Sequence, residues 1–166
     1  MERLWSPWRS QYIESFKTQD EAPGCVFCSA LGASDDADVF LIHRGVHSFI
    51  VMNLYPYNAG HLLVLPNKHA ARIDSLTPDE KTELMDMIAL GAAIVEKGLA
   101  CHGYNVGANF GRVAGAGITE HLHMHIVPRW NGDTNFMTVF HDVRIISEEM
   151  KKTHAKLLEA KHAILG

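Results

Sequence analysis

Three histidines alternate with apolar residues in the stretch His121-Leu122-His123-Met124-His125-Ile126-Val127. Side chains of a β-strand point alternately to the two faces of a sheet. A strand here places all three imidazoles on one face and the apolar side chains on the other, whereas a helix would spread the imidazoles around its axis at about 100° per residue. We therefore predict a strand with one core face and one chemical face, ended by Pro128, which lacks an N–H for the ladder.

A glycine-rich segment, residues 109–117, directly precedes the histidine strand. Its glycines allow positive φ and close approach to a ligand, so its N–H groups are candidates for binding phosphate oxygens. Alone, such a segment is usually only a turn. Beside three imidazoles it indicates nucleophilic displacement at phosphorus, since a neutral imidazole with a pKa of about 6.5 is a good nucleophile. The central His123 is best placed to attack, and a neighbouring imidazolium can donate to the leaving oxygen.

The rest of the chain predicts an α+β fold. Three strand candidates cover residues 39–42, 48–53 and 61–65 and are expected to form a meander, and a further strand covers residues 103–109. The longer segment 53–60 between two of them carries turn-forming residues and is a candidate functional loop. With the histidine strand, we expect a mainly antiparallel, five-stranded meander sheet.

Two helices are expected to pack this sheet. Thr77-Pro78-Asp79-Glu80 has the capping box and the first-turn proline of a helix start. Apolar residues then recur at three- and four-residue steps as far as Ala100, which predicts one long helix with a buried stripe. A second helix is expected from Ser147, within a C-terminal helical tail at 140–166.

Length and composition limit the classes of function. The chain has 166 residues, 47% of them hydrophobic, which predicts a single domain over 1–166 with an aromatic arm at 1–22. A net charge of -4 without a basic run argues against a nucleic-acid polymer as partner. No signal sequence or membrane-spanning apolar stretch is apparent, so a soluble, cytoplasmic protein is expected.

The cysteines indicate a metal site. Their number is three, which suits reduced thiols better than a disulfide framework. Cys25 and Cys28 have the C-x-x-C spacing of a metal knuckle or redox pair, and two histidines would complete a closed, structural zinc site. The sequence leaves open which of the eleven histidines take part, and two buried or redox-active thiols are the alternative.

Together these motifs resemble the histidine triad (HIT) family of nucleotide hydrolases and transferases, whose signature is His-x-His-x-His followed by apolar residues. The resemblance covers most of the chain and includes Asn53, His61, the loop 109–117 and the run 127–136. With Leu4-Trp-Ser-Pro-Trp-Arg9, these features are most similar to the bacterial branch that contains diadenosine tetraphosphate phosphorylases and hydrolases.

The resemblance implies a role for each site residue. His123 attacks the α-phosphorus and becomes transiently nucleotidylated, while His125 contacts the scissile phosphate and helps the leaving group to depart. The implied nucleotide- and phosphate-binding residues are Asn53 at the ribose, His61 in the nucleotide pocket, and Asn109, Gly115, Ala116, Gly117 and Thr119 at the phosphates. The implied zinc ligands are Cys25, Cys28, His69 and His121.

The resemblance also implies an activity and an assembly. The expected reaction splits a phosphoanhydride bond of a dinucleoside polyphosphate, such as diadenosine tetraphosphate, without an organic cofactor, in a homodimer whose sheet continues across the interface. The phosphorylase branch has Gly-Ser where this chain has Ala116-Gly117, so water is the expected acceptor. The alternatives are phosphorolysis by inorganic phosphate, a low-turnover nucleotide-binding sensor, and a zinc-binding interaction module.

Overall fold

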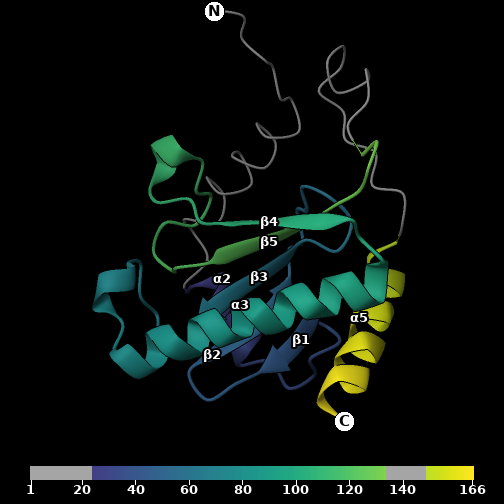
Figure 1. Ribbon diagram of the computed structural model, residues 1–166. Coiled ribbons are helices and arrows are strands. Elements are labelled where there is room, and N and C mark those ends of the chain that lie inside the picture. The colour runs from purple at the N-terminus through teal and green to yellow at the C-terminus, as the bar shows by residue number, and fades with distance from the viewer. Residues whose placement is uncertain (1–23, 134–148) are drawn as a thin grey trace, which may run out of the picture.

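Five strands form one antiparallel sheet, and two long helices pack beside one of its faces (Figure 1). The structure is a computed structural model and describes residues 24–133 and 149–166. The strands are β1 (Leu41–Arg44), β2 (Ser48–Met52), β3 (Leu62–Pro66), β4 (Gly103–Gly107) and β5 (Met124–Arg129). The helices are α2 (Val26–Leu31), α3 (Pro78–Leu99) and α5 (Met150–Leu165), with 3-10 turns η1 (Ile73–Ser75) and η2 (Arg112–Ala114).

This architecture confirms the expected α+β class, the five antiparallel strands and both helices. The expected aromatic arm at 1–22 lies outside the described residues, as does the start of the helical tail at 140–148. Within the described residues, no helix combines the length and the apolar character that crossing a membrane requires.

The strand order β1-β2-β3-β5-β4 departs from a simple meander at one point. The first three strands follow one another as predicted, but β5 lies between β3 and β4. The physical reason is burial: three of the six residues of β5 are buried and one is exposed, whereas four of the five residues of β4 are exposed. The hairpin β4–β5 therefore places its apolar strand inside the sheet and its exposed strand at the edge.

Both faces of the central strands are covered, which explains their continuous apolar sequences. All five residues of β2 and all five of β3 are buried. Ile50, Met52, Leu62 and Val64 belong to the core beside α3, while their neighbours Phe49, Val51, Leu63 and Leu65 form a second cluster that Phe27 and Leu31 of α2 cover.

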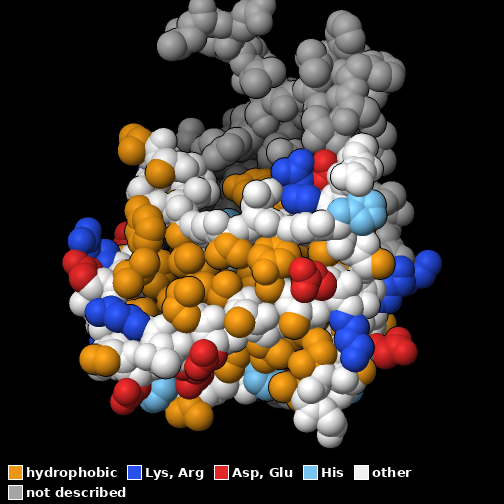
Figure 2. Space-filling view, in the orientation of Figure 1, with side chains coloured by type: hydrophobic (Ala, Val, Ile, Leu, Met, Phe, Trp, Pro, Cys, Tyr) orange, Lys and Arg blue, Asp and Glu red, His pale blue; other side chains and the backbone are white. Residues whose placement is uncertain are grey.

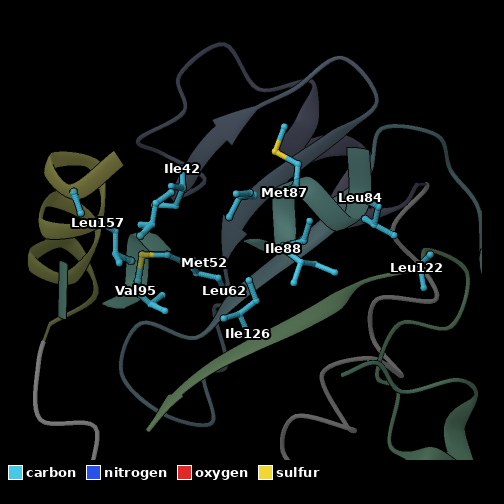
Figure 3. Close-up of a cluster of buried hydrophobic side chains, with 14 of the residues drawn as sticks. Ile42, Met52, Leu62, Leu84, Met87, Ile88, Val95, Leu122, Ile126 and Leu157 are labelled. Atoms are coloured by element: carbon cyan, nitrogen blue, oxygen red, sulfur yellow. The ribbon is translucent and has the colours of Figure 1, made fainter. Parts of the chain in front are cut away.

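Helix α3 begins with the predicted capping box. The Glu80 N–H donates to the Thr77 hydroxyl, and the Glu80 carboxylate accepts from the Thr77 N–H at 2.7 Å. Leu84, Met87, Ile88 and Val95 of α3 share one buried cluster with Leu62, Met52 and Ile126 of the sheet (Figure 3). Gly91 allows this close packing, since a Cβ there would lie 2.6 Å from Ile126 Cδ1.

The histidine segment has the predicted alternation but different ends. Leu122 and Ile126 are buried beside α3, while His125 pairs with Leu63 and shares its opposite face. Regular pairing begins only at Met124, because the Leu122 N–H donates to Ala70 O at 2.7 Å instead of to a strand.

Pro128 does not end this strand, so that prediction is wrong. It lies within β5 opposite Tyr104. Its carbonyl oxygen accepts a hydrogen bond from Asn58 Nδ2 at 3.1 Å. The backbone polar groups of Pro128 therefore point away from β4. The missing proline N–H is therefore not needed by the ladder.

Ile126→Ala is expected to lower the free energy of unfolding by about 2–5 kcal/mol, because it opens a cavity under Gly91 in a fully buried site. Urea denaturation measures this change. The matched control Val113→Ala alters a fully exposed side chain and is expected to stay within about 0.5 kcal/mol. Equal effects of both substitutions would contradict the central position of Ile126.

Candidate active site and metal site

Three histidines from distant parts of the chain meet on the sheet face opposite α3. His125 pairs with Leu63, and His61, two residues before Leu63, lies on the same face as the diagonal neighbour of His125. Nε2 of His61 consequently lies 2.9 Å from Nδ1 of His125, and the rings of His123 and His125 are 5.1 Å apart. All three imidazoles are buried, so their hydrogen bonds determine their protonation.

The hydrogen bonds of His123 indicate that one of its ring nitrogens is unprotonated. Its Nδ1 lies 2.8 Å from the carbonyl oxygen of His121, and a carbonyl can only accept, so the proton is on Nδ1. Burial lowers the pKa of His123, although the bond to that carbonyl opposes the shift. The ring is therefore neutral at pH 7 with a lone pair on Nε2, which is the form that a nucleophile needs.

His125 presents the opposite tautomer. The Tyr57 N–H donates to His61 Nδ1 at 3.0 Å, so the single proton of neutral His61 is on Nε2 and is donated to His125 Nδ1. His125 then carries its own proton on Nε2, a buried atom that has no hydrogen-bond partner among the described residues. Burial, then the neighbouring His123, lowers the pKa of His125 to about 4. Neutral His125 is a hydrogen-bond donor.

Asn53 joins this group of histidines. Its Oδ1 accepts from the Tyr55 N–H at 3.0 Å, and its Nδ2 lies 3.3 Å from His61 Nδ1. The structure thus brings two of the predicted nucleotide-binding residues together, while the ribose contact of Asn53 stays a prediction.

The glycine-rich loop has the expected backbone conformation. Gly111 and Gly115 have φ values of +79° and +93°, which favour glycine. The N–H groups of Gly115 and Ala116 donate within the loop, to Arg112 O at 3.0 Å and to Gly111 O at 3.2 Å. Phosphate binding by this loop stays a prediction.

The remaining residues predicted to contact phosphate are Asn109, Gly117 and Thr119. Asn109 and Gly117 are half-buried at the two ends of the glycine-rich loop. The Thr119 hydroxyl donates to the Glu120 carboxylate at 2.9 Å. Their contacts with a nucleotide also stay predictions.

The four predicted metal ligands lie together. The candidate ligand atoms of Cys25, Cys28, His69 and His121 are all within 4.8 Å of one another. Cys25 Sγ is 3.4 Å from His121 Nδ1, and Cys28 Sγ is 3.4 Å from His69 Nδ1. Two sulfurs and two imidazole nitrogens are the donor set of a closed structural zinc site.

Neighbouring groups affect the orientation and the protonation of these candidate ligands. His121 Nε2 donates to Pro66 O at 2.9 Å, so its lone pair on Nδ1 faces the two sulfurs, as in many metal sites. Burial, then the neighbouring Cys25, raises the pKa of the Cys28 thiol. A bound cation would offset this effect and hold both sulfurs as thiolates. The residues present therefore fit a zinc ion.

Two aromatic residues of the site were not identified from the sequence. Phe27 packs against His121 and His123, with ring centroids 5.6 and 5.3 Å away. Tyr57 stacks on His61 at 4.9 Å and on His125 at 5.8 Å. The sequence places Phe27 between two cysteines and Tyr57 in the candidate loop 53–60. Neither position indicates which histidine ring the aromatic side chain contacts.

Comparison with known proteins gives matches along most of the chain. The family model of the HIT domain matches residues 35–132. An AP-4-A phosphorylase of Mycobacterium tuberculosis (strain CDC 1551 / Oshkosh) is 35% identical over 162 residues, which are 95% of this chain and 83% of that protein. The asymmetrical bis(5'-nucleosyl)-tetraphosphatase of Schizosaccharomyces pombe is 30% identical over 117 residues, 70% of this chain and 60% of that protein.

A solved structure agrees with the fold. A Zn-bound histidine triad family protein from Mycobacterium smegmatis has a TM-score of 0.69 to this structure, over 85% of this chain and 95% of that one, at 23% identity. The likeness at this identity concerns the arrangement of strands and helices.

The buried, neutral His125 is expected to make stability fall on acidification. Its pKa is about 4 in the folded chain and about 6.5 in the unfolded chain, so between these values the unfolded chain binds more protons. His125 therefore contributes full stability above about pH 6.5 and loses up to about 1.4 kcal/mol per pH unit down to about pH 4. Urea denaturation at several pH values measures this slope.

His125→Asn is the control, since asparagine does not titrate in this range. The variant is expected to show a shallower decline of unfolding free energy between pH 6.5 and 4 than the unaltered protein. Parallel declines would contradict a neutral, buried His125.

Proposed function

The chain belongs to the histidine triad (HIT) family, and on that premise we propose that it cleaves a phosphoanhydride bond of a dinucleoside polyphosphate. It is an enzyme of the nucleotide hydrolase and transferase type. One observation carries the proposal: the hydrogen bonds around two neighbouring histidines of one segment favour opposite tautomers, with a lone pair on His123 Nε2 and a proton on His125 Nε2.

The two tautomers have different roles in one nucleophilic displacement at phosphorus. The lone pair of His123 Nε2 forms a bond to the α-phosphorus, and the bond from phosphorus to the bridging oxygen breaks with its electrons on the oxygen. The N–H of His125 stabilises the charge that develops there. The bond from His123 Nδ1 to the His121 carbonyl supports the positive charge on the nucleotidylated ring. A second acceptor then attacks phosphorus and releases His123.

Water is the proposed acceptor, and inorganic phosphate is the second candidate. The Ala116-Gly117 pair, in place of Gly-Ser, supports water. The mycobacterial relative, which is a phosphorylase by name, supports phosphate. Both relatives named above act on nucleoside tetraphosphates by name, which supports a diadenosine polyphosphate as the substrate.

A structural zinc ion is part of the proposal, held by Cys25, Cys28, His69 and His121. The ion would supply a closed, tetrahedral crosslink with no open position for a substrate. His121 is the important ligand, because its carbonyl orients His123. Holding His121 thus fixes the hydrogen bond that keeps the lone pair on His123 Nε2.

A homodimer with a continuous sheet is also proposed. β4 has a strand partner on one side only among the described residues. Tyr104 and Val106 on this strand are 40% and 44% exposed, and Figure 2 shows an apolar band between β4 and α3. A second copy of β4 would pair the open edge and cover these side chains.

The remaining expectations are proposals too. We place the chain in the cytoplasm, because Cys25, Cys28 and Cys101 form no disulfide, as in a reducing compartment. A single domain over 1–166 is part of the same proposal. The formal charge of -4 supports a small nucleotide over a nucleic-acid polymer as partner.

Incubation with diadenosine tetraphosphate is expected to give AMP and ATP, and chromatography of the products checks this. ADP and ATP formed only when phosphate is present would establish phosphorolysis instead. His123→Ala is expected to lower kcat/KM by about 10³-fold or more, since it removes the nucleophile. His162→Ala, at an exposed position of α5, is the matched control, and full activity of His123→Ala would refute the mechanism.

Cobalt substitution tests the metal ligands. Co²⁺ in place of zinc is expected to give the visible absorption of a tetrahedral thiolate site, and Cys28→Ser is expected to weaken that band and lower the bound metal. The control Cys101→Ser alters a cysteine outside the four-ligand group and should leave both unchanged. Identical metal content in all three proteins would exclude this site.

A further inference from the structure

We propose that Asp133 is a positioning residue for nucleotide binding: its carboxylate anchors the loop 53–60 (the nucleotide loop) to the end of β5 through the side chain of Asn58. The inference rests on the proposed function and adds to it a residue outside the histidine segment. The observations that carry it are hydrogen bonds and one ion pair that join the nucleotide loop, the turn after β5 and the neighbouring strand β4.

A tight turn after β5 brings Asp133 back toward the strand end. The Asp133 N–H donates to Trp130 O at 3.1 Å, which closes a four-residue turn. Gly132, the third residue of this turn, has a φ of +81°, a value that a type II turn requires there and that glycine adopts without strain. The turn directs the Asp133 carboxylate at the preceding backbone, where the Trp130 N–H donates to Oδ2 at 3.2 Å.

Arg129 holds the same carboxylate in a two-pronged ion pair. Its Nε lies 2.6 Å from Asp133 Oδ2, and its Nη2 lies 2.9 Å from Oδ1. Its Nη1 also donates to Asn105 Oδ1 on β4, at 3.1 Å, so the ion pair is connected to two neighbouring strands. The Asp133 side chain is only 11% exposed. A shielded, two-pronged pair holds its geometry better than an isolated surface pair.

Asn58 connects this carboxylate to the nucleotide loop. Its Nδ2 donates to Asp133 Oδ2 at 3.0 Å and to Pro128 O at 3.1 Å. Its Oδ1 accepts from the Ala59 N–H at 3.1 Å. The amide hydrogens thus face two acceptors and the oxygen faces a donor, which fixes the orientation of the amide. The Asn58 carbonyl oxygen accepts from the His61 N–H at 3.2 Å, so the anchor also reaches the end of the loop.

The nucleotide loop brings two side chains to the candidate site. Tyr57 stacks on the rings of His61 and His125, with centroids 4.9 and 5.8 Å away. Asn53, the predicted ribose ligand, begins the loop, and its N–H donates to His61 O at 2.9 Å. This bond joins the two ends of the loop, while Asn58 sets its position relative to β5. A loop held in this way loses less conformational entropy when it binds a nucleotide.

Loss of the anchor is expected to weaken nucleotide binding more than the chemical step. His125 is held by its pairing with Leu63 and Gly107 in the sheet, which a substitution at Asp133 leaves in place. Asp133→Ala is therefore expected to raise the KM for diadenosine tetraphosphate about tenfold, as for the loss of one hydrogen bond to a charged group. The change in kcat is expected to be much smaller.

Hydrogen–deuterium exchange of the unliganded protein tests the anchor without a substrate. In Asp133→Ala, the amides of residues 53–61 are expected to exchange faster, because the hydrogen bonds of the loop open more often, while α3 exchanges as before. Asn58→Ala removes the same link and keeps the ion pair, so it is expected to have a similar effect. The double variant is expected to resemble the single variants, since all three lack one shared link.

Asp74→Ala is the matched control. Asp74 also forms a two-pronged ion pair with an arginine, Arg72, at 2.7 and 2.9 Å. This pair belongs to η1, between β3 and α3, and the Asp74 side chain is 65% exposed. Its loss is expected to leave both the KM and the exchange of the nucleotide loop unchanged.

Unchanged loop exchange in Asp133→Ala, or additive effects of Asn58→Ala and Asp133→Ala on KM, would overturn the inference and leave the proposed function intact. A fall in kcat at an unchanged KM would overturn it as well, since Asp133 would then act on the chemical step. If the unaltered protein cleaves no dinucleoside polyphosphate, the proposed function fails and the nucleotide role of Asp133 fails with it, while the exchange rates still decide whether Asp133 anchors the loop. Should Asp133→Ala not fold, Asn58→Ala decides through the same two measurements.

Discussion

The antiparallel pairing of β3 with β5 is the constraint on which the site depends. It sets Leu62 opposite Ile126 and Leu63 opposite His125, and so carries His61 to within hydrogen-bond distance of His125. The pairing is held by burial, since Leu62 and Ile126 pack beneath α3 while Leu63 is covered from the other face. A shift of one residue would move every histidine to the wrong face.

Main-chain groups, more than side chains, determine what each histidine does. The Pro66 carbonyl directs the lone pair of His121 toward the cysteines, and the His121 carbonyl places the proton of His123 on Nδ1. The Tyr57 N–H fixes the proton of His61 and, through it, that of His125. The proposed ligating, attacking and donating roles of the three imidazoles differ because His121 and His123 face two different carbonyl groups, whereas His125 faces the ring of His61.

Much of the fold could be predicted where the signal is local. The capping box predicted the start of α3 at Pro78, and alternation predicted the two faces of the histidine segment. Strand order depends on which hairpin strand is more buried, a comparison between distant segments, and it was missed. Pro128 was misjudged because the rule on proline in strands applies only to residues whose N–H faces a paired neighbour.

The sequence by itself determined which chemical groups this protein has and on which face of a strand they lie, because alternation is a property of consecutive residues. It also indicated the family and the four candidate metal ligands through motifs that resemble known ones. Only the tertiary structure decided the protonation of each ring and the part played by Tyr57, Phe27, Asn58 and Asp133. These follow from contacts between segments far apart in the chain, where a hydrogen bond's direction depends on which donor faces which acceptor.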